Sequence, residues 1–323
     1  MNRRDFVGLF AGAAAAYPLS TRAQSRIFRV AMLTLDASEN AERFRGLLGE
    51  LGYTDGKNLA FVYRSADDNP ARLAAFADEF VRDRPDVLVA GWGTLAPKAL
   101  KSATSSIPIV FVTVGDPIGA GLVQSLAHPG GNVTGLSGQS TEFKSKQLEL
   151  LLTCVPNQQV VGVLLNPDTP YTALALKQLT AAAEKMGVRL ELLQVRQAAD
   201  FTAESMDRLV LRGATSLLIV EDPLANTIRD EVVAQARRLH LATITGMATY
   251  AQAGALMVYG TDLSENYRRA AGYVDKILKG ASPGDLPVEQ PTKFRLILNL
   301  KTATALGREL PPSILVAADE VIE

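Results

Sequence analysis

The chain has 323 residues, 47% of them apolar, with 33 Lys and Arg against 34 Asp and Glu. A formal net charge of −1 leaves no basic surplus to neutralise phosphates, which argues against a nucleic-acid partner. A chain of this length and apolar content can bury a large core and usually divides into two lobes.

Residues 1–24 have the features of an export signal. Arg3-Arg4 precedes the apolar run Gly8–Ala16, and small residues stand before a cut ahead of Gln24. The twin arginine favours the twin-arginine (Tat) route, with an ordinary Sec signal as the alternative. The apolar run is shorter than the ~20 residues that span a bilayer, and Cys154, the only cysteine, lies too far along the chain to carry an acyl anchor. We expect a periplasmic mature protein without stable membrane insertion.

In the first half of the mature chain, apolar strands alternate with amphipathic helices. The expected strands are Arg29–Leu35, Leu59–Tyr63, Asp86–Ala90 and Ile107–Val112. The expected helices are Asn40–Leu51, one that follows Asn69-Pro70, and one that begins near Thr94. Continuous apolar strands indicate a parallel sheet that is covered on both faces.

The series starts again after Gly130-Gly131-Asn132. Further strands are expected at Val160–Leu165, Arg189–Val195, Ser216–Val220 and Leu241–Thr245, and further helices at Ala173–Met186, Phe201–Leu211 and Leu224–Leu239. The pattern predicts an α/β fold with two doubly wound parallel-sheet lobes joined by a hinge. We expect an N-terminal lobe of residues 27–137 plus about 260–285, and a C-terminal lobe of 138–259 plus about 286–323. The chain would cross between them near 130–138, 256–261 and 283–287.

Polar and aromatic residues follow almost every strand. In an open parallel sheet, ligands lie beyond the carboxyl ends of the strands, beside helix N-termini. The candidates for ligand binding in the first lobe are Leu35, Asp36, Ser38, Trp92, Gly93, Thr94, Val114, Gly115, Asp116 and Ser137. Those in the second lobe are Asn166, Asp168, Tyr171, Asp222, Met247, Tyr250, Tyr259 and Asp262.

Several candidates have a structural alternative. Three aspartates lie next to a proline: Asp116, Asp168 and Asp222. Each could be a turn residue or a helix cap and have no contact with a ligand. Trp92, the only tryptophan, offers a stacking surface for an aromatic solute, or could pack under a neighbouring loop. If the solute is an amino acid, Asp116 or Asp222 would pair with its ammonium group, because a buried unpaired charge is costly.

Catalytic patterns are not found in the sequence. His128 and His240 have no cysteine or acidic residue at metal-binding spacing, and the nucleophile elbow, the P-loop and the three-glycine dinucleotide fingerprint are absent. We therefore expect no enzymatic activity, no cofactor and no metal.

Four stretches together resemble one family: LGYTDGKNL (51–59), IPIVFVTVGDPIGAGLVQSLAHPGGNVTGLS (107–137), YRRAAGYVDKILKGASPGDLPVEQPTKFRLILNLKTATALG (267–307) and PPSILVAADEVIE (311–323). From about Arg29 to its end the chain resembles periplasmic substrate-binding proteins of ABC transporters, in a mostly uncharacterised family that includes aromatic amino-acid binders. The resemblance implies a type I periplasmic-binding-protein fold, a small-molecule solute, and a membrane permease and ATPase as partners of a monomer. The loop Gly91–Ala96 departs from the family's Gly-Gly-Thr-Pro-Ala-Ala pattern by its tryptophan, which leaves the solute unidentified.

Two other functions remain open from the sequence. The same fold could serve as a sensory protein that presents its ligand to a membrane receptor, or as a periplasmic α/β enzyme. Neighbouring permease and ATPase genes would favour transport over sensing, and turnover assays would test for an enzyme.

Overall fold

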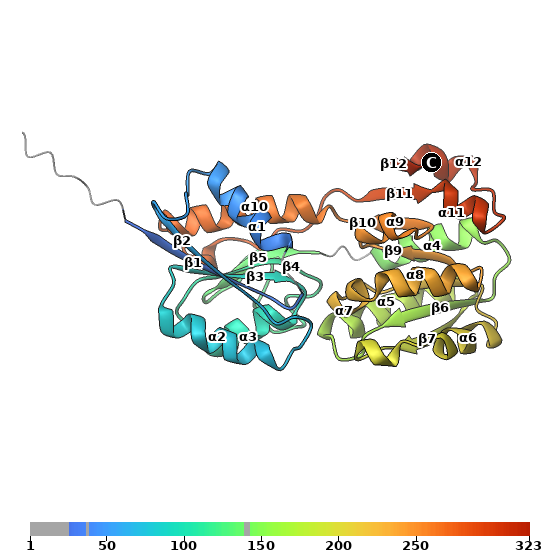
Figure 1. The fold of residues 1–323 in the computed structure, drawn as a ribbon, viewed down its shortest axis with the longest axis horizontal. Coiled ribbons are helices and arrows are strands. Elements are labelled where there is room, and N and C mark those ends of the chain that lie inside the picture. The colour runs from blue at the N-terminus through green and yellow to red at the C-terminus, as the bar shows by residue number, and fades with distance from the viewer. Residues whose placement is uncertain (1–25, 37–38, 139–142) are drawn as a thin grey trace, which may run out of the picture.

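The computed structural model describes residues 26–36, 39–138 and 143–323. The expected signal segment and Ser38 lie outside these residues. The described chain forms two sheets, each with helices on both faces, in two lobes placed side by side (Figure 1). We use N-lobe for the part built on the first sheet together with helix α10, and C-lobe for the part built on the second sheet.

The sheet of the N-lobe has the strand order β2-β1-β3-β4-β5, and all of its pairings are parallel. Its strands are β1 (Phe28–Thr34), β2 (Leu59–Ser65), β3 (Val87–Trp92), β4 (Ile109–Val114) and β5 (Val133–Ser137). Its helices are α1 (Glu39–Glu50), α2 (Arg72–Asp83), α3 (Leu95–Ala103) and α10 (Leu263–Leu278).

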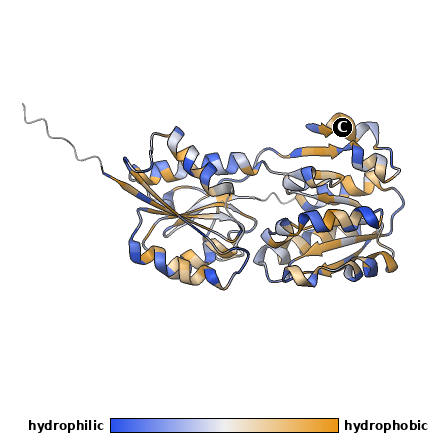
Figure 2. Cartoon of the chain, in the orientation of Figure 1, coloured by the Kyte–Doolittle hydropathy of each residue, from blue (hydrophilic) through white to orange (hydrophobic). Residues whose placement is uncertain are grey.

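Helices cover both faces of this sheet because successive strand residues point to opposite sides. Val30 and Met32 of β1 belong to a hydrophobic cluster with Phe44 of α1 and Tyr267 of α10. Ala31 and Leu33 of β1 pack with Phe80 of α2 on the other face. Figure 2 shows the resulting pattern, with apolar strands inside and hydrophilic helix surfaces outside.

The C-lobe contains the longer sheet, in the order β12-β11-β10-β9-β8-β6-β7. Its strands are β6 (Val160–Leu165), β7 (Arg189–Gln194), β8 (Ser216–Ile219), β9 (Ala242–Thr245), β10 (Met257–Gly260), β11 (Arg295–Asn299) and β12 (Glu320–Ile322). Its helices are α4 (Phe143–Cys154), α5 (Pro170–Met186), α6 (Ala203–Leu211), α7 (Pro223–Thr227), α8 (Arg229–Arg238), α9 (Thr249–Ala253), α11 (Leu300–Ala305) and α12 (Pro312–Ala317). Short 3₁₀ turns occur at Ala198–Asp200 and Pro283–Asp285.

The chain passes between the lobes after β5, between β10 and α10, and before β11. The third passage lies beyond the 283–287 region, because the main-chain N–H of Ser137 in β5 still bonds to the carbonyl of Glu289 (2.8 Å). One aromatic ring stands at the C-lobe end of each passage, and the three rings stack on one another. Phe143 lies 5.9 Å from Tyr259 and 5.4 Å from Phe294 between ring centroids, and Tyr259 and Phe294 are 5.6 Å apart.

The α/β fold with two sheet-based lobes, expected from the sequence, is confirmed. Two details differ. The expected helix 224–239 is divided into α7 and α8. Strand β11 runs antiparallel to β10, because the chain returns from the N-lobe and enters the sheet from the opposite end.

Candidate functional site

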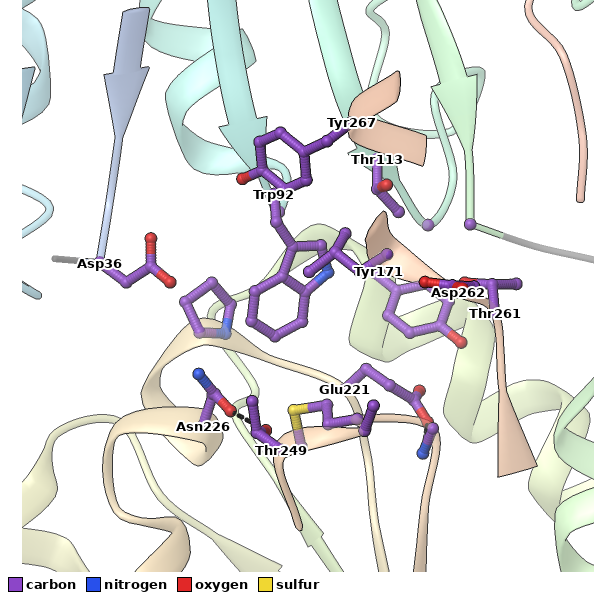
Figure 3. A pocket seen from close by; sticks show the side chains of 18 of the residues that line it. Asp36, Trp92, Thr113, Tyr171, Glu221, Asn226, Thr249, Thr261, Asp262 and Tyr267 are labelled. Carbon is purple, nitrogen blue, oxygen red and sulfur yellow. Dashed lines mark hydrogen bonds between the residues drawn. The ribbon is translucent and has the colours of Figure 1, made fainter. Parts of the chain in front are cut away.

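The carboxyl ends of strands from both sheets meet where the two lobes face each other. The two sheets share one strand order, β2-β1-β3-β4-β5 in the N-lobe and β7-β6-β8-β9-β10 in the C-lobe. In each, the second strand in sequence lies on the outer side of the first. The order reverses between β1 and β3 in one sheet and between β6 and β8 in the other, which is where such sheets bind ligands. The loops that follow these four strands line a cavity of about 570 Å³ (Figure 3).

Both lobes contribute to the cavity wall. The N-lobe provides Asp36, Arg43, Trp92, Gly93, Thr94, Thr113, Gly115, Gly138, Leu263, Ser264 and Tyr267. The C-lobe and the passage after β10 provide Phe143, Thr169, Tyr171, Glu221, Pro223, Asn226, Arg229, Gly246, Met247, Ala248, Thr249, Thr261 and Asp262.

The lobes touch each other around this cavity. The half-buried Trp92 of the N-lobe packs against the hydrophobic cluster of the C-lobe that contains Met247. A Cβ atom at Gly115 would lie 2.4 Å from Cδ2 of Tyr171, and one at Gly93 would lie 3.1 Å from Cγ of Pro223. The structure therefore has the closed arrangement of its two lobes.

Asp36 provides a carboxyl group on the N-lobe side of the cavity. Its main-chain carbonyl accepts hydrogen bonds from the hydroxyls of Thr34 (2.6 Å) and Ser65 (2.7 Å), which fixes the loop after β1. The carboxyl group points toward the cavity (Figure 3). Burial, and secondly the negative charge of Asp68, raise the pKa of Asp36 to about 6. A cationic group placed beside it would reverse this effect.

Tyr267 of α10 lies at the same wall. Its side chain is 1% exposed, and its hydroxyl is buried without a well-formed hydrogen bond to any described residue. Burial raises the pKa of this hydroxyl, so it remains protonated and can donate. A buried hydroxyl without a partner is costly, and a polar group of a solute would remove that cost.

On the C-lobe side, Glu221 follows β8 and is held by three donors. Its Oε1 accepts from the N–H of Gly246 (2.8 Å) and from Nε2 of Gln147 (2.9 Å), and its Oε2 accepts from Lys144. Lys144 is fully buried, and desolvation lowers the pKa of its ammonium group, an effect that the charge of Glu221 opposes.

Sequence reasoning did not select Lys144, Glu221 or Tyr267. Lys144 stands in the buried stripe of α4 with Phe143, Gln147, Leu148 and Leu151, where the helical period predicts an apolar residue. That departure was a usable signal. Tyr267 gave none, because a tyrosine on the apolar stripe of a helix is usually a core residue.

Eight of the residues expected to bind ligand line the cavity. They are Asp36, Trp92, Gly93, Thr94, Gly115, Tyr171, Met247 and Asp262. All are at strand ends, in the loops that follow or, for Tyr171, in the first turn of the next helix, as the topology of a parallel sheet requires. Their contact with a solute remains a prediction.

Five other candidates lie away from the cavity lining; four are buried structural residues, and Tyr259 is partly buried. Leu35 and Val114 belong to the N-lobe core, and Ser137 is a buried residue of β5. Tyr250 is fully buried and donates its hydroxyl to the carbonyl of Ala225 (2.5 Å). Tyr259 stacks with the rings of Phe143 and Phe294.

The polar candidates outside the lining serve turns and caps. Asp116 accepts from the N–H of Gly119 (2.8 Å), and the exposed Asp168 pairs with Arg196 (3.3 Å). The buried Asp222 is the N-cap of α7. Its carboxylate accepts from the N–H of Leu224 (2.9 Å), the hydroxyl of Thr169 (2.5 Å) and the amide of Asn166 (3.3 Å). Asn166 is thereby used within the C-lobe.

No helix in the described ranges is long and apolar enough to cross a membrane. Nor do residues 26–36, 39–138 and 143–323 bring three or more His, Cys, Asp or Glu side chains together at a spacing suited to a metal ion.

Two α/β lobes joined by three passages, with a cavity between the carboxyl ends of their strands, define a type I periplasmic-binding-protein fold. Residues 37–322 match the family model described as ABC transporter substrate binding protein. The chain belongs to this family, and its function is the capture of a small molecule.

Individual relatives agree with this assignment. The chain is 30% identical over 269 residues to a tyrosine-binding protein of Clostridioides difficile (strain R20291). The match covers 81% of this chain and 74% of the relative. It superposes on an ABC domain from Streptococcus pneumoniae in complex with L-Trp with a TM-score of 0.85, at 24% identity, over 92% of this chain and 100% of the other.

A third relative was solved in a ligand-free, open state. This substrate binding protein with adhesive properties from Clostridium difficile is 25% identical, and the match covers 92% of this chain and 99% of the other. Its TM-score is 0.67, against 0.85 for the L-Trp complex at nearly the same identity. The lobe arrangement of this chain thus resembles the liganded relative more than the open one.

Proposed function

We propose that this protein captures a small solute with a protonated amine and an apolar, ring-sized body, of the aromatic amino-acid class, by closing its lobes over it. One observation carries the proposal: rings and a carboxyl group from both lobes line a single cavity between them. Trp92 and Asp36 come from the N-lobe, and Tyr171 comes from the C-lobe. A cavity of about 570 Å³ is in the range of small-molecule sites, ~300–1,000 Å³.

Asp36 is the group that we assign to the amine of the solute. It replaces Asp116 and Asp222 in that role, because both of these carboxylates cap turns outside the cavity lining. Glu221 already has the ammonium group of Lys144 beside it. Asp262, the other acid on that side, is the N-cap of α10 and accepts from the N–H of Ser264. A cation next to Asp36 would stabilise its ionised form, and the hydroxyl of Tyr267 would satisfy a second polar group of the solute.

The body of the solute would lie among Trp92, Tyr171, Pro223 and Met247. These side chains come from both lobes, so one planar solute would contact both. Such contacts exist only when the lobes are closed, and a ligand shifts a conformational equilibrium by its extra contacts in one state. Closure would thus be the result of binding.

The relatives support this solute class. Their names state tyrosine binding and a complex with L-Trp. Trp92, the last residue of β3, provides a second aromatic wall and makes the cavity well suited to a ring.

The family supports a role in solute uptake. We assign the protein to the periplasm, after export by its N-terminal signal, as a monomer that delivers its solute to a membrane permease with a cytoplasmic ATPase. We assign no catalytic role to it, because neither a nucleophile–base pair nor a metal set is found among the cavity-lining residues.

The test is a calorimetric titration panel of L-tyrosine, L-tryptophan, L-phenylalanine, the matching arylpropionic acids without the amine, aliphatic amino acids and sugars. We expect one-to-one binding of an aromatic amino acid and loss of binding when the amine is absent. Equal binding of the amine-free acids would exclude the assigned role of Asp36. Binding of sugars alone would exclude the solute class.

A further inference from the structure

Lys144 is a fully buried lysine beside the cavity, and it does not line the cavity itself. Lysine is almost never fully buried unless it is paired. Its Nζ donates to Oε1 of Gln147 (2.8 Å) and to the carboxylate of Glu221. The desolvation of this ammonium group is costly, and a pair of apolar residues would often serve stability equally well. The position of the pair therefore points to a role in the site.

The partners of Lys144 are cavity-wall groups. Glu221 keeps 14% of its side chain exposed and lines the cavity. The rings of Phe143 and Tyr171, which also line it, lie 5.1 Å and 6.0 Å from Nζ of Lys144. One ammonium group thus contacts three separate parts of the wall.

The hydrogen bonds of Glu221 leave room for one more donor. An ionised carboxylate offers about four acceptor positions. Gly246 and Gln147 use Oε1, and Lys144 uses Oε2. Among the described residues no donor uses the second position on Oε2, and the carboxylate cannot turn without breaking the other bonds. Glu221 can therefore accept a single N–H or O–H of a solute in a fixed direction.

The same network reaches the passages between the lobes. Gln147 donates to the main-chain carbonyl of Tyr259 in β10 (3.0 Å), and Phe143, next to Lys144, stacks on Tyr259 and Phe294. A solute that bonds to Glu221 would thus act on groups held by all three passages.

We propose that Lys144 is a positioning residue of the solute site: it holds the carboxylate of Glu221 in the orientation in which the free position of Oε2 accepts one hydrogen bond from the solute. The inference rests on the proposed function in one respect, that the solute occupies this cavity.

The experiment compares Lys144→Met, Glu221→Gln and the double variant with the unchanged protein, by calorimetric titration with L-tyrosine and L-tryptophan. The matched control is Lys146→Met, two residues further along α4, where an exposed lysine pairs with Glu149. We expect affinity to fall about tenfold or more in each single variant, since a hydrogen bond to a charged group is lost. The double variant should bind no more weakly than Glu221→Gln, and the control should not change.

Non-additivity separates positioning from general loss of structure. If Lys144 acts through Glu221, its removal costs affinity only while the carboxylate of Glu221 is present. Equal affinity of Lys144→Met and the unchanged protein would overturn the inference. A lower affinity of the double variant than of Glu221→Gln would also overturn it.

If Lys144→Met fails to fold, the test compares Glu221→Gln with the double variant Lys144→Met/Glu221→Gln. The double variant can still fold, because it buries no unpaired charge. The inference is supported if the double variant binds as tightly as Glu221→Gln or more tightly, with both below the unchanged protein; any other order overturns it. Failure of the proposed function would look different: the unchanged protein would not bind aromatic amino acids. The four proteins would then be compared with the solute that the panel identifies.

Discussion

Gly115, in the loop after β4, lies directly against the ring of Tyr171 at the start of α5, with no room for a side chain between them. A Cβ atom at this glycine would be 2.4 Å from Cδ2, 2.6 Å from Cγ and 2.9 Å from Cε2 of Tyr171. The two residues belong to different lobes, so the clash would arise in the closed arrangement alone. Closure thus requires glycine at position 115.

The variant Gly115→Ala should therefore weaken solute binding without unfolding either lobe. We expect a loss in affinity of about tenfold or more, from an overpacking cost of about 1–3 kcal/mol. The control is Gly272→Ala in α10, where a Cβ atom would meet nothing within 4 Å. Calorimetry and solute-free thermal unfolding are the measurements. Undiminished affinity in Gly115→Ala would show that the solute does not require this closed state.

Trp92 should report binding by its own fluorescence, because it is the only tryptophan and it lines the cavity. Adding solute should shift its emission under excitation that spares tyrosine. Trp92→Phe should lose less affinity than Trp92→Ala, because a ring stacked on the solute contributes about 0.5–1.5 kcal/mol beyond its buried area. Emission that stays constant while calorimetry detects binding would place the solute away from this ring.

The pKa of Asp36 predicts how stability depends on pH. It rises from 3.8 to about 6 on folding, so between these values unfolding releases a proton. The free energy of unfolding of the solute-free protein should fall as the pH rises from about 4 to about 6, by up to about 3 kcal/mol. Asp36→Asn should reduce this slope in denaturant titrations; an unchanged slope would mean that Asp36 ionises normally.

Solute binding should have the opposite dependence on pH. A cationic amine binds ionised Asp36, so affinity should fall as the pH drops below about 6, by up to about tenfold per pH unit. Asp36→Asn should bind weakly at neutral pH and with little pH dependence. The exposed Asp168 provides a control, since Asp168→Asn changes a surface pair with Arg196. The same pH profile in Asp36→Asn and the unchanged protein would rule out this pairing.

Asp222 and Asp262 both cap helices, but only the second lines the cavity. Asp222→Ala should lower the free energy of unfolding by about 2 kcal/mol, because a cap and the bond from Thr169 are lost. Its effect on affinity should be small. Asp262→Ala should lower stability by about 1 kcal/mol and also weaken binding. If Asp222→Ala abolishes binding in a folded protein, Asp222 contacts the solute.

The fold could be predicted from the sequence because each sheet is buried on both faces. Strands such as β3 and β6 then appear as continuous apolar runs, and the helices between them as amphipathic stretches. The direction of β11 could not be predicted, because the run Arg295–Asn299 has the same composition in either orientation.

The site was partly predictable for a related reason. Strand ends mark where a loop lies, so Asp36, Trp92 and Tyr171 were found. They do not tell which side chain of a loop turns to the cavity. Glu221 and Asp222 are adjacent in the sequence, yet Asp222 caps α7 and Glu221 lines the cavity. Lys144 and Tyr267 come from helices and do not follow a strand end. The charged partner of Lys144, Glu221, lies 77 residues away along the chain.

The central claim is that one small solute lies between the lobes and contacts both. The most direct measurement is a crystal structure of the protein with the solute that the titration panel identifies. We expect one molecule between Trp92 and Tyr171, with its amine at the carboxylate of Asp36. A solute bound outside this cavity, or one that contacts a single lobe, would contradict it.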